Sequence, residues 1–325
     1  MHSDELRSGV EEAYDRIQSH IFRTPLKFSN WLSKKGTSVY LKLENLQHTG
    51  SFKLRGALSK LTSLSEVELQ KGIITASTGN HGLDTAYSLD KLKLKGSIFL
   101  PENVIKSKLV KLKKFTSDLE FHGQDGVQTE AKAKQTSQEN NIPYISPYND
   151  LQVIYGQGTI GIEIREQLKD IDYVFVTVGG GGLISGIGGY LKSLNHDITI
   201  VGCQPLNSPV MYESIKAGEI VDIKSTETIS DGSAGGIEKG SITFGLVKSF
   251  VDKFVLVTEE EIEKSIVDLL QEDNVLAEGA AGVAVASFLR FCSDNQISGN
   301  IVIIVCGGNI GLNKVKQLIS VYGNN

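Results

Sequence analysis

Short apolar runs rich in β-branched residues alternate with helix-like segments along most of this 325-residue chain. Such alternation predicts strands joined by helical crossovers, and therefore an α/β fold with parallel sheets covered by helices on both faces. The predicted strands are 39–43, 73–76, 97–100, 119–122, 143–145, 173–178, 198–203, 254–257 and 301–306. Helical spacing of apolar residues predicts helices over 5–17, 127–140, 158–168, 185–194, 260–272 and 278–292.

No repeat or low-complexity segment marks a domain boundary, so the boundary must come from the pattern of elements. The alternation between residues 71 and 147 is long enough to form a small α/β unit of its own. We therefore predict two open parallel-sheet domains, a large one of residues 1–70 and 148–325 and a small one of residues 71–147. Ligands of such sheets bind beyond the carboxyl ends of the strands, so we expect a site between the two domains.

Composition and charge exclude several classes of function. The net charge is −5 and no run of like charges occurs, so nucleic acid is not an expected partner. The longest apolar runs have about six residues, whereas a membrane-spanning helix needs about 20. The polar N-terminus is unlike a signal peptide, and three widely spaced cysteines indicate a reducing compartment, so we expect a cytoplasmic protein. The six histidines lack zinc-ligand spacing, and no metal is expected.

The segment 49–57 contains the first candidate for catalysis, Lys53. It lies between Gly50 and Gly56, which allow a close approach of the backbone to a ligand. A lysine used in covalent catalysis must be partly desolvated and held near its electrophile. The neighbouring Phe52 is suited to pack against a cofactor ring. Taken alone, the pattern is equally compatible with a solvated lysine near the start of a helix at about residue 55.

A second motif follows the predicted strand 73–76, where a helix is expected to begin. It consists of Ser77, Thr78, Gly79, Asn80, His81 and Gly82. Backbone N–H groups at a helix start bind anions such as a substrate carboxylate, and the Asn80 amide can donate to an oxygen on a cofactor. An ordinary capped turn with a structural His81 would explain the hydroxyl groups but not the whole cluster, so we prefer a binding role.

Four consecutive glycines lie directly after the predicted strand 173–178. They are Gly179, Gly180, Gly181 and Gly182, and Leu183 follows them. Their uncovered amides and the dipole of the next helix would cradle a phosphate. No Lys-Ser/Thr pair follows, so the loop is not a P-loop. The dinucleotide pattern G-x-G-x-x-G fails at Ser185, and Gln204 stands where an acid would hold a ribose. A lone phosphate is therefore predicted, and a merely flexible loop is the weaker alternative.

The segment Cys306, Gly307, Gly308 and Asn309 follows the last predicted strand. A side chain at this strand end would face the same crevice as the glycine loop. A thiol is a weak partner for a pyridine nitrogen and would leave that nitrogen unprotonated. Taken alone, a buried structural cysteine is the simpler interpretation of Cys306.

These four motifs, in this order and at these separations, resemble those of the fold-type II pyridoxal 5′-phosphate (PLP) enzymes, whose fold is like that of the tryptophan synthase β subunit. The likeness is greatest to the serine/threonine dehydratases and serine racemases. It extends over nearly the whole chain, from residues 23–26, Arg-Thr-Pro-Leu, to residues 306–309. The form Ser-Phe-Lys-Leu-Arg-Gly-Ala at residues 51–57 is typical of the dehydratases.

The resemblance implies PLP as the cofactor and a role for each motif. Lys53 would form a Schiff base with PLP and later take the Cα proton, while Phe52 would pack beside the ring and Asn80 would hydrogen-bond its oxygen. Gly179 to Leu183 would hold the phosphate, and Cys306 would meet the pyridine nitrogen. The carboxylate-binding loop would be Ser77, Thr78, Gly79, Asn80 and His81. Asp231, Gly232 and Glu278 match positions near the ring.

The implied activity is the deaminating dehydration of L-threonine or L-serine, by β-elimination, to a 2-oxo acid and ammonia, in a homodimer. Two alternatives stay open. Thr78 has a hydroxyl where racemases use a serine, so the chain could be a racemase, or a dehydratase of another β-hydroxy amino acid such as serine or 3-hydroxyaspartate. A non-catalytic PLP-binding protein is the other alternative, which the intact Lys53 disfavours.

Two departures from the family pattern narrow the expected regulation. Magnesium-activated relatives carry acids after the strand that matches 198–203, where this chain has none before Glu213. A magnesium site is therefore not expected there. The chain also ends soon after the predicted PLP-binding region, so we expect no regulatory domain and no feedback by isoleucine.

Overall fold

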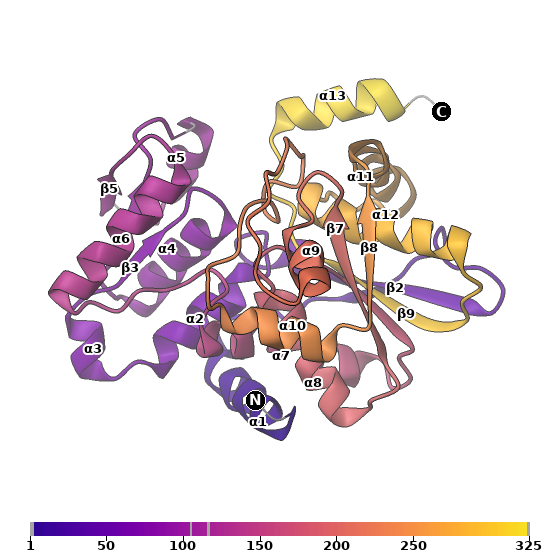
Figure 1. Cartoon of the computed structure of the whole chain (residues 1–325), viewed down its shortest axis with the longest axis horizontal. Helices are drawn as coiled ribbons and strands as arrows, with labels where there is room; N and C mark the ends of the chain where they lie inside the picture. Colours follow the sequence, from indigo (N-terminus) through magenta and orange to yellow (C-terminus); the bar gives the residue numbers. More distant parts are fainter. Residues whose placement is uncertain (1–2, 105, 116–117, 324–325) are drawn as a thin grey trace.

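The computed structural model describes residues 3–104, 106–115 and 118–323, which fold into two lobes around two sheets (Figure 1). The larger sheet has the strand order β1 (Leu26–Phe28), β2 (Thr37–Leu43), β9 (Gly299–Val305), β6 (Tyr173–Thr177), β7 (Thr199–Pro205) and β8 (Lys253–Val257). The smaller sheet has the order β3 (Ile74–Ala76), β4 (Ser97–Leu100) and β5 (Leu119–Phe121). Only β1 and β2 pair in antiparallel fashion among these strands. The predicted α/β class is confirmed.

Helices cover both faces of the large sheet (Figure 1). On one side lie α1 (Ser3–Ile17), α7 (Leu151–Gln167), α8 (Gly182–Leu194) and α10 (Ile242–Phe250). On the opposite side lie α11 (Glu259–Asp273), α12 (Gly279–Asp294) and α13 (Leu312–Tyr322). The small lobe contains α3 (Glu66–Gln70), α4 (Asn80–Leu92), α5 (Lys106–Leu112) and α6 (Gly126–Asn140). The remaining helices are η1 (Glu44–Leu46), α2 (Lys53–Ser63), which leads from the large lobe to the small one, and α9 (Val210–Ala217).

Two helices begin three or more residues earlier than the apolar spacing predicts. The structure starts α7 at Leu151 instead of residue 158, because the Asp150 carboxylate accepts hydrogen bonds from the N–H groups of Gln152 and Val153 at 2.8 and 3.3 Å. Gly156 allows this helix to pack closely against α2, since a Cβ at this position would lie 2.5 Å from the carbonyl oxygen of Arg55. The glycine loop likewise passes directly into α8 at Gly182, so the predicted start at residue 185 is also late.

The predicted strand over 143–145 is wrong. Tyr144 forms only an isolated bridge with Ile74, and Pro143 has no N–H to extend a ladder. The short antiparallel strand β1 was not predicted, because three residues carry too little periodicity. The other predicted strands are present, with ends that differ by about two residues at most, which is the usual uncertainty of such boundaries.

The core of the large lobe centres on β6 and β9, whose Val174, Phe175, Val176 and residues 301–305 are fully buried. Such strands are typical of the centre of a parallel sheet. The core of the small lobe also includes Leu61 of α2 and Val153 of α7. Helices that begin in the large lobe therefore help to bury the small sheet. The division at residues 70/71 and 147/148 stays a prediction.

The fold brings the four motifs together at the carboxyl ends of the strands. Three of them directly follow β3, β6 and β9. The fourth is joined to the end of β9, because Phe52 N–H donates to the carbonyl oxygen of Cys306 at 3.0 Å and Ser51 bridges Gly307. Across the described ranges, none of the helices combines the length and the apolar character that a membrane crossing requires.

Candidate active site

Lys53 is the first residue of α2, and its side chain is half-buried between the two lobes. Its Nζ donates to the carbonyl oxygen of Pro147 at 2.7 Å and lies 5.2 Å from the centre of the Phe52 ring. Burial lowers the pKa of Lys53 to about 8, although nearby acidic groups, above all Asp84, act in the opposite direction. An amine with this pKa is partly neutral near physiological pH, and the neutral form is the nucleophile.

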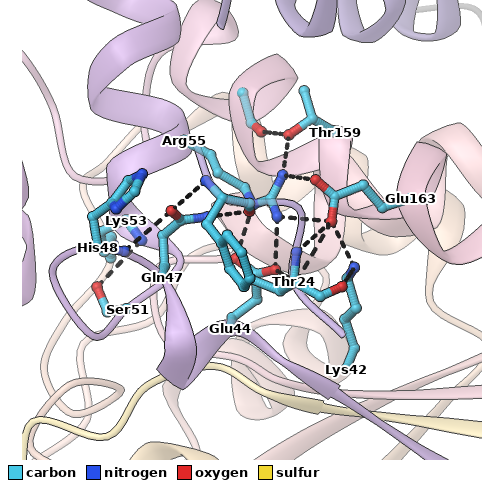
Figure 2. A network of polar contacts seen from close by, with 12 residues as sticks. Thr24, Lys42, Glu44, Gln47, His48, Ser51, Lys53, Arg55, Thr159 and Glu163 are labelled. Atoms are coloured by element: carbon cyan, nitrogen blue, oxygen red, sulfur yellow. Dashed lines mark hydrogen bonds and ion pairs between the residues drawn. The ribbon is translucent and has the colours of Figure 1, made fainter. Parts of the chain in front are cut away.

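Arg55, two residues after Lys53, is completely buried and uses all five of its N–H donors (Figure 2). Its Nε and Nη2 each donate to the Glu44 carboxylate at 2.8 Å. Its Nη1 and Nη2 donate to the Glu163 carboxylate at 2.7 and 3.0 Å, and Nη1 also donates to the Thr159 hydroxyl at 3.2 Å. Burial opposes the charge of Arg55, but the two carboxylates outweigh it and hold its pKa above the ordinary value.

Lys42 on β2 completes this cluster. Its Nζ donates to the Glu163 carboxylate at 2.6 Å, to the carbonyl oxygen of Thr24 at 2.7 Å and to the Gln167 side chain at 3.0 Å. The two cations and two carboxylates, here called the Arg55 network (Lys42, Glu44, Arg55 and Glu163), balance in charge and are fully buried. The network joins β2, η1, α2 and α7 (Figure 2), so it fixes the position of the helix that begins with Lys53.

The glycine loop lines a small cavity of about 40 Å³. Its other walls include Lys53, Tyr148, Ser233 and Cys306, with Leu183 beside the loop. Side chains are excluded from the loop, because a Cβ on Gly180 would lie 2.3 Å from the Tyr148 ring and Gly181 has a φ of +87°. The residue that precedes α8 is Gly181, and no side chain in the described part of the chain caps this helix, so its first amides are available to an anion.

Cys306 is buried and lies in the wall of this small cavity together with Lys53. Burial, reinforced by the charge of Glu278, raises the pKa of the Cys306 thiol well above its ordinary value. The residue is therefore an uncharged thiol. Cys306 is thus buried, as a structural cysteine would be, and it also borders the cavity; its contact with a pyridine nitrogen stays a prediction.

The motif at residues 77–81 lines a larger cavity of about 780 Å³. Lys53 and Phe52 belong to the walls of both cavities, so the glycine loop and the 77–81 motif meet at this lysine. The helix α4 begins at Asn80, and no side chain caps it. Its first N–H groups can therefore bind an anion placed in the larger cavity.

The side chain of His81 is buried in the small lobe, where its Nε2 contacts two neighbouring polar groups. Its Nε2 lies 3.0 Å from the Thr75 hydroxyl and 3.0 Å from the carbonyl oxygen of Ile145. Burial, followed by the charge of Lys53, lowers the pKa of His81 to about 3, so the ring is neutral. Nε2 therefore makes structural contacts, and the backbone is the part of His81 that remains suited to ligand binding.

Asn80, Glu278 and Asn309 form a polar triad between the two lobes. The Asn80 amide donates to the Glu278 carboxylate at 2.8 Å and accepts from the Asn309 amide at 2.9 Å. Glu278 also accepts from the backbone N–H of Asn309 at 2.9 Å. Burial raises the pKa of Glu278 to about 7, partly opposed by this N–H group. The triad ties the start of α4 to the start of α12 and to the loop after β9.

Several wall residues were missed by sequence reasoning. Tyr148 packs on the glycine loop, and its hydroxyl accepts the N–H of Glu238 at 3.0 Å. Lys108 and Lys111 of α5 border the larger cavity, where Lys108 pairs with Asp231 at 3.2 Å. These residues come from segments without a recognisable motif, and only the spacing of the two lysines on one helix face would have hinted at them.

Comparisons with known proteins agree with this arrangement. The family profile described as pyridoxal-phosphate dependent enzyme matches residues 17–307. The catabolic L-threonine dehydratase TdcB of Escherichia coli (strain K12) is 39% identical over 311 residues, which are 95% of this chain and 94% of that protein. The structure of processed threonine deaminase isoform 2 from Solanum lycopersicum has a TM-score of 0.93 and 32% identity, covering 99% of this chain and 95% of the other. Serine racemase from Dictyostelium discoideum has a TM-score of 0.86 and 34% identity, covering 94% and 98%.

The similarity is neither local nor confined to the fold. The family profile spans the first three motifs and the first two residues of the fourth, and the relatives match over nearly their full lengths at more than 30% identity. This chain therefore belongs to the fold-type II family of pyridoxal-phosphate dependent enzymes, and its cofactor is PLP.

Proposed function

We propose that this enzyme is a deaminating dehydratase that converts L-threonine and L-serine to a 2-oxo acid and ammonia. One observation carries the proposal: Lys53 lies in the walls of two cavities, one formed by the glycine loop and the other by the 77–81 motif. A lysine in this place can serve a cofactor on one side and a substrate on the other. Relatives named for L-threonine dehydration, at 39% identity, support the same reaction.

The residues around Lys53 fit PLP. The glycine loop forms a cradle that a Cβ would fill, and the uncapped start of α8 suits a phosphate. The lowered pKa of Lys53 leaves part of its amine neutral for a covalent link to the PLP aldehyde. PLP, when bound, withdraws electrons from the Cα–H bond of an amino acid and so makes its proton removable.

Each motif then has a defined task in our proposal. The N–H groups at the start of α4, with Ser77 and Thr78, bind the substrate carboxylate. Lys53 Nζ would take the Cα proton, and the β-hydroxyl would leave as water with that proton. The Lys53 amine would then replace the substrate nitrogen on the cofactor and free an enamine, which tautomerises to an imine, and a second water hydrolyses this imine to 2-oxo acid and ammonia. The uncharged Cys306 thiol, in the wall of the small cavity, would face the pyridine nitrogen and supply no charge to it, which would favour loss of the hydroxyl over a long-lived carbanion.

A panel of amino acids tests the reaction. L-threonine, L-serine, D-serine and the 3-hydroxyaspartates are each incubated with the PLP-loaded enzyme, and 2-oxo acid, ammonia and stereochemical inversion are measured. We expect 2-oxo acid and ammonia in equal amounts from L-threonine and L-serine. No 2-oxo acid from any substrate would overturn the dehydratase proposal, and visible PLP absorbance without turnover would indicate a PLP-binding protein that is not an enzyme.

Racemisation is a second candidate activity. Thr78 lies in the wall of the larger cavity with a hydroxyl that can donate a proton, and a solved serine racemase is 34% identical to this chain. The inversion measurement in the same panel decides it. If Thr78 donates the proton, Thr78→Ala should remove inversion of serine and leave 2-oxo acid formation measurable.

Gly180→Ala should weaken PLP binding by at least about tenfold, or about 1.4 kcal/mol. The added Cβ would lie 2.3 Å from the Tyr148 ring, so the ring or the phosphate-binding loop must move. Titration of the PLP-free protein with PLP, followed by visible absorbance, measures the change. Gly236→Ala is the matched control, because among the described residues none but its two chain neighbours has an atom within 4 Å of its Cβ position. Wild-type affinity in the Gly180 variant would contradict the phosphate assignment.

We also propose that the enzyme works in the cytoplasm as a homodimer of two-domain subunits, with the domain limits given above. Support for a reducing compartment comes from Cys203, Cys292 and Cys306, which are all free thiols. The dimer rests on the resemblance to the family. Light scattering over a range of concentrations tests the oligomeric state, and a monomer at micromolar concentration would contradict it.

A further inference from the structure

Asp84 is a buried acid beside the site that the proposed reaction does not use. It lies on α4 four residues after Asn80, so both side chains share one helix face. Its carboxylate accepts a hydrogen bond from the Ser51 hydroxyl at 2.6 Å, and both residues are completely buried. The Ser51 oxygen in turn accepts the backbone N–H of Lys53 at 3.3 Å. A short chain of hydrogen bonds therefore joins α4 to the segment that carries Lys53.

The Asp84 carboxylate has few hydrogen-bond partners for a buried charged group. Its Oδ1 has no hydrogen-bond partner within the ranges that the structure describes, and the same holds for the nearby buried hydroxyl of Thr49. Among those residues it also forms no ion pair within 4.0 Å. Burial raises the pKa of Asp84 to about 7, and the hydrogen bond from the Ser51 hydroxyl acts in the opposite direction. A buried carboxylate with so few partners lowers stability, and such groups are concentrated at functional sites.

The titratable groups around Lys53 come from three parts of the fold. Asp84 of α4 acts most strongly to keep Lys53 protonated, and Glu278 before α12 acts in the same direction, whereas the Cys306 thiol after β9 is uncharged. His81, also on α4, is neutral. Glu278 is engaged by Asn80 and Asn309, as described above, whereas among the described residues Ser51 alone has a hydroxyl within 3.5 Å that donates to Asp84. Of the two acids, Asp84 and Glu278, Asp84 therefore has fewer hydrogen bonds to compensate its negative charge.

We propose that Asp84 is a positioning residue that provides the counter-charge for Lys53 Nζ and holds the lysine segment against the carboxylate-binding helix α4. The inference rests on the proposed function, in which Lys53 carries the cofactor and takes the Cα proton. When that proton moves to Nζ, the ionised Asp84 stabilises the resulting ammonium and does not itself take the proton. Asp84 acts through Lys53 and Ser51 and is not a catalytic residue.

Asp84→Asn separates charge from packing, because the asparagine oxygen can still accept the Ser51 hydroxyl. The pKa of Lys53 is measured in the PLP-free protein from the pH dependence of its acetylation by acetic anhydride, with exposed Lys91 as the internal standard and mass spectrometry as the readout. We expect the pKa to fall by about one unit, a tenfold loss of proton affinity. Circular dichroism checks the fold.

Ser51→Ala gives an independent test. Loss of its hydroxyl removes the hydrogen bond that favours the ionised Asp84, so more of the carboxyl is neutral near pH 7. The pKa of Lys53 should fall in this variant as well, and the double variant should show no larger shift than Asp84→Asn alone. Asp273→Asn is the matched control, since the buried Asp273 accepts from the Ser29 hydroxyl at the same distance, 2.6 Å, far from Lys53 in the sequence. It should leave the pKa of Lys53 unchanged.

The PLP-loaded enzyme supplies a second readout. In Asp84→Asn, kcat for L-threonine should fall and its pH profile should shift, while KM changes by less than about twofold because Asp84 is not in the wall of either cavity. An unchanged Lys53 pKa in Asp84→Asn, or an equal shift in Asp273→Asn, would overturn the role of Asp84. Trapping of PLP on another lysine would overturn the proposed function instead, and the labelling of Lys53 without PLP keeps the two failures distinct.

Discussion

Lys53→Ala is expected to reduce 2-oxo acid formation from L-threonine by at least about 10³-fold while the fold stays intact. Alanine can neither form the covalent link to PLP nor accept the Cα proton, so both proposed tasks of the side chain are lost. The structural cost is small, because the only hydrogen bond that Nζ makes within the described ranges goes to the carbonyl oxygen of Pro147. Turnover, circular dichroism and the visible absorbance of bound PLP measure the three parts of this expectation.

Two controls separate the loss of chemistry from a general loss of structure. Lys91→Ala removes an exposed lysine from α4 and should retain full activity. Borohydride reduction of the wild-type enzyme followed by peptide mapping should find the cofactor on Lys53. Activity of Lys53→Ala close to that of the wild type, or a label on a different lysine, would show that the site assignment is wrong.

Glu163→Gln should lower the free energy of unfolding by about 3–5 kcal/mol. The Glu163 carboxylate accepts hydrogen bonds from Arg55 and Lys42 in surroundings closed to solvent. Burial acts to raise the pKa of Glu163, but the two cations outweigh it and lower the value, so the group is ionised at neutral pH. The glutamine keeps the shape of the side chain but leaves Lys42 and Arg55 with one negative charge between them. Urea unfolding of the PLP-free protein measures the loss.

The pair Arg7–Glu11 on α1 provides a control of the same chemistry at the surface. Its nitrogen–oxygen distance is 2.8 Å, close to those in the Arg55 network, but both side chains are about half exposed. Glu11→Gln should therefore cost less than about 0.5 kcal/mol, since water screens the charges. Similar losses in the two variants would mean that burial does not govern the strength of the Arg55 network.

The ionisation of Glu163 should also make stability depend on pH in the acid range. A depressed pKa for Glu163 in the folded protein means that its contribution to stability is complete above the pKa of the unfolded chain. The contribution is lost as the pH falls through the folded pKa, because the carboxyl must then take up a proton. Protonation of Glu163 should therefore contribute to the loss of stability of the wild type in acid. The free energy of unfolding of Glu163→Gln should depend less on pH in the same range.

Much of the fold followed from local patterns. The strands β6 and β9 were predicted from unbroken apolar runs, since only a strand buried on both faces needs such a run. The helix α7 was placed seven residues too late, because its start depends on the Asp150 cap and its glycines depend on neighbouring helices. The segment 143–145 had the composition of a strand but makes only a single bridge.

The site could be predicted only in outline. The glycine loop and the 77–81 motif can be recognised from their composition. Because both follow predicted parallel strands, they were expected to lie at the carboxyl ends of the strands, on the same side of the molecule. Sequence reasoning gave no hint of Asp84 or Tyr148, whose neighbours are ordinary helix and loop residues. It also gave no reason to expect a buried Arg55, because arginine is almost never fully buried unless it is paired.

By itself the sequence determined the strand–helix alternation, the four motifs and the preference for a lone phosphate over a dinucleotide, because each of these depends on residues adjacent in the chain. Only the tertiary structure decided which side chains face one another. Three hydrogen-bonded pairs show this. The partners Arg55 and Glu163 are 108 positions apart in the sequence, Asp84 and Ser51 are 33 apart, and Asn80 and Asn309 are 229 apart. No pattern within one segment specifies such contacts, since the packing of helices on the two sheets sets them.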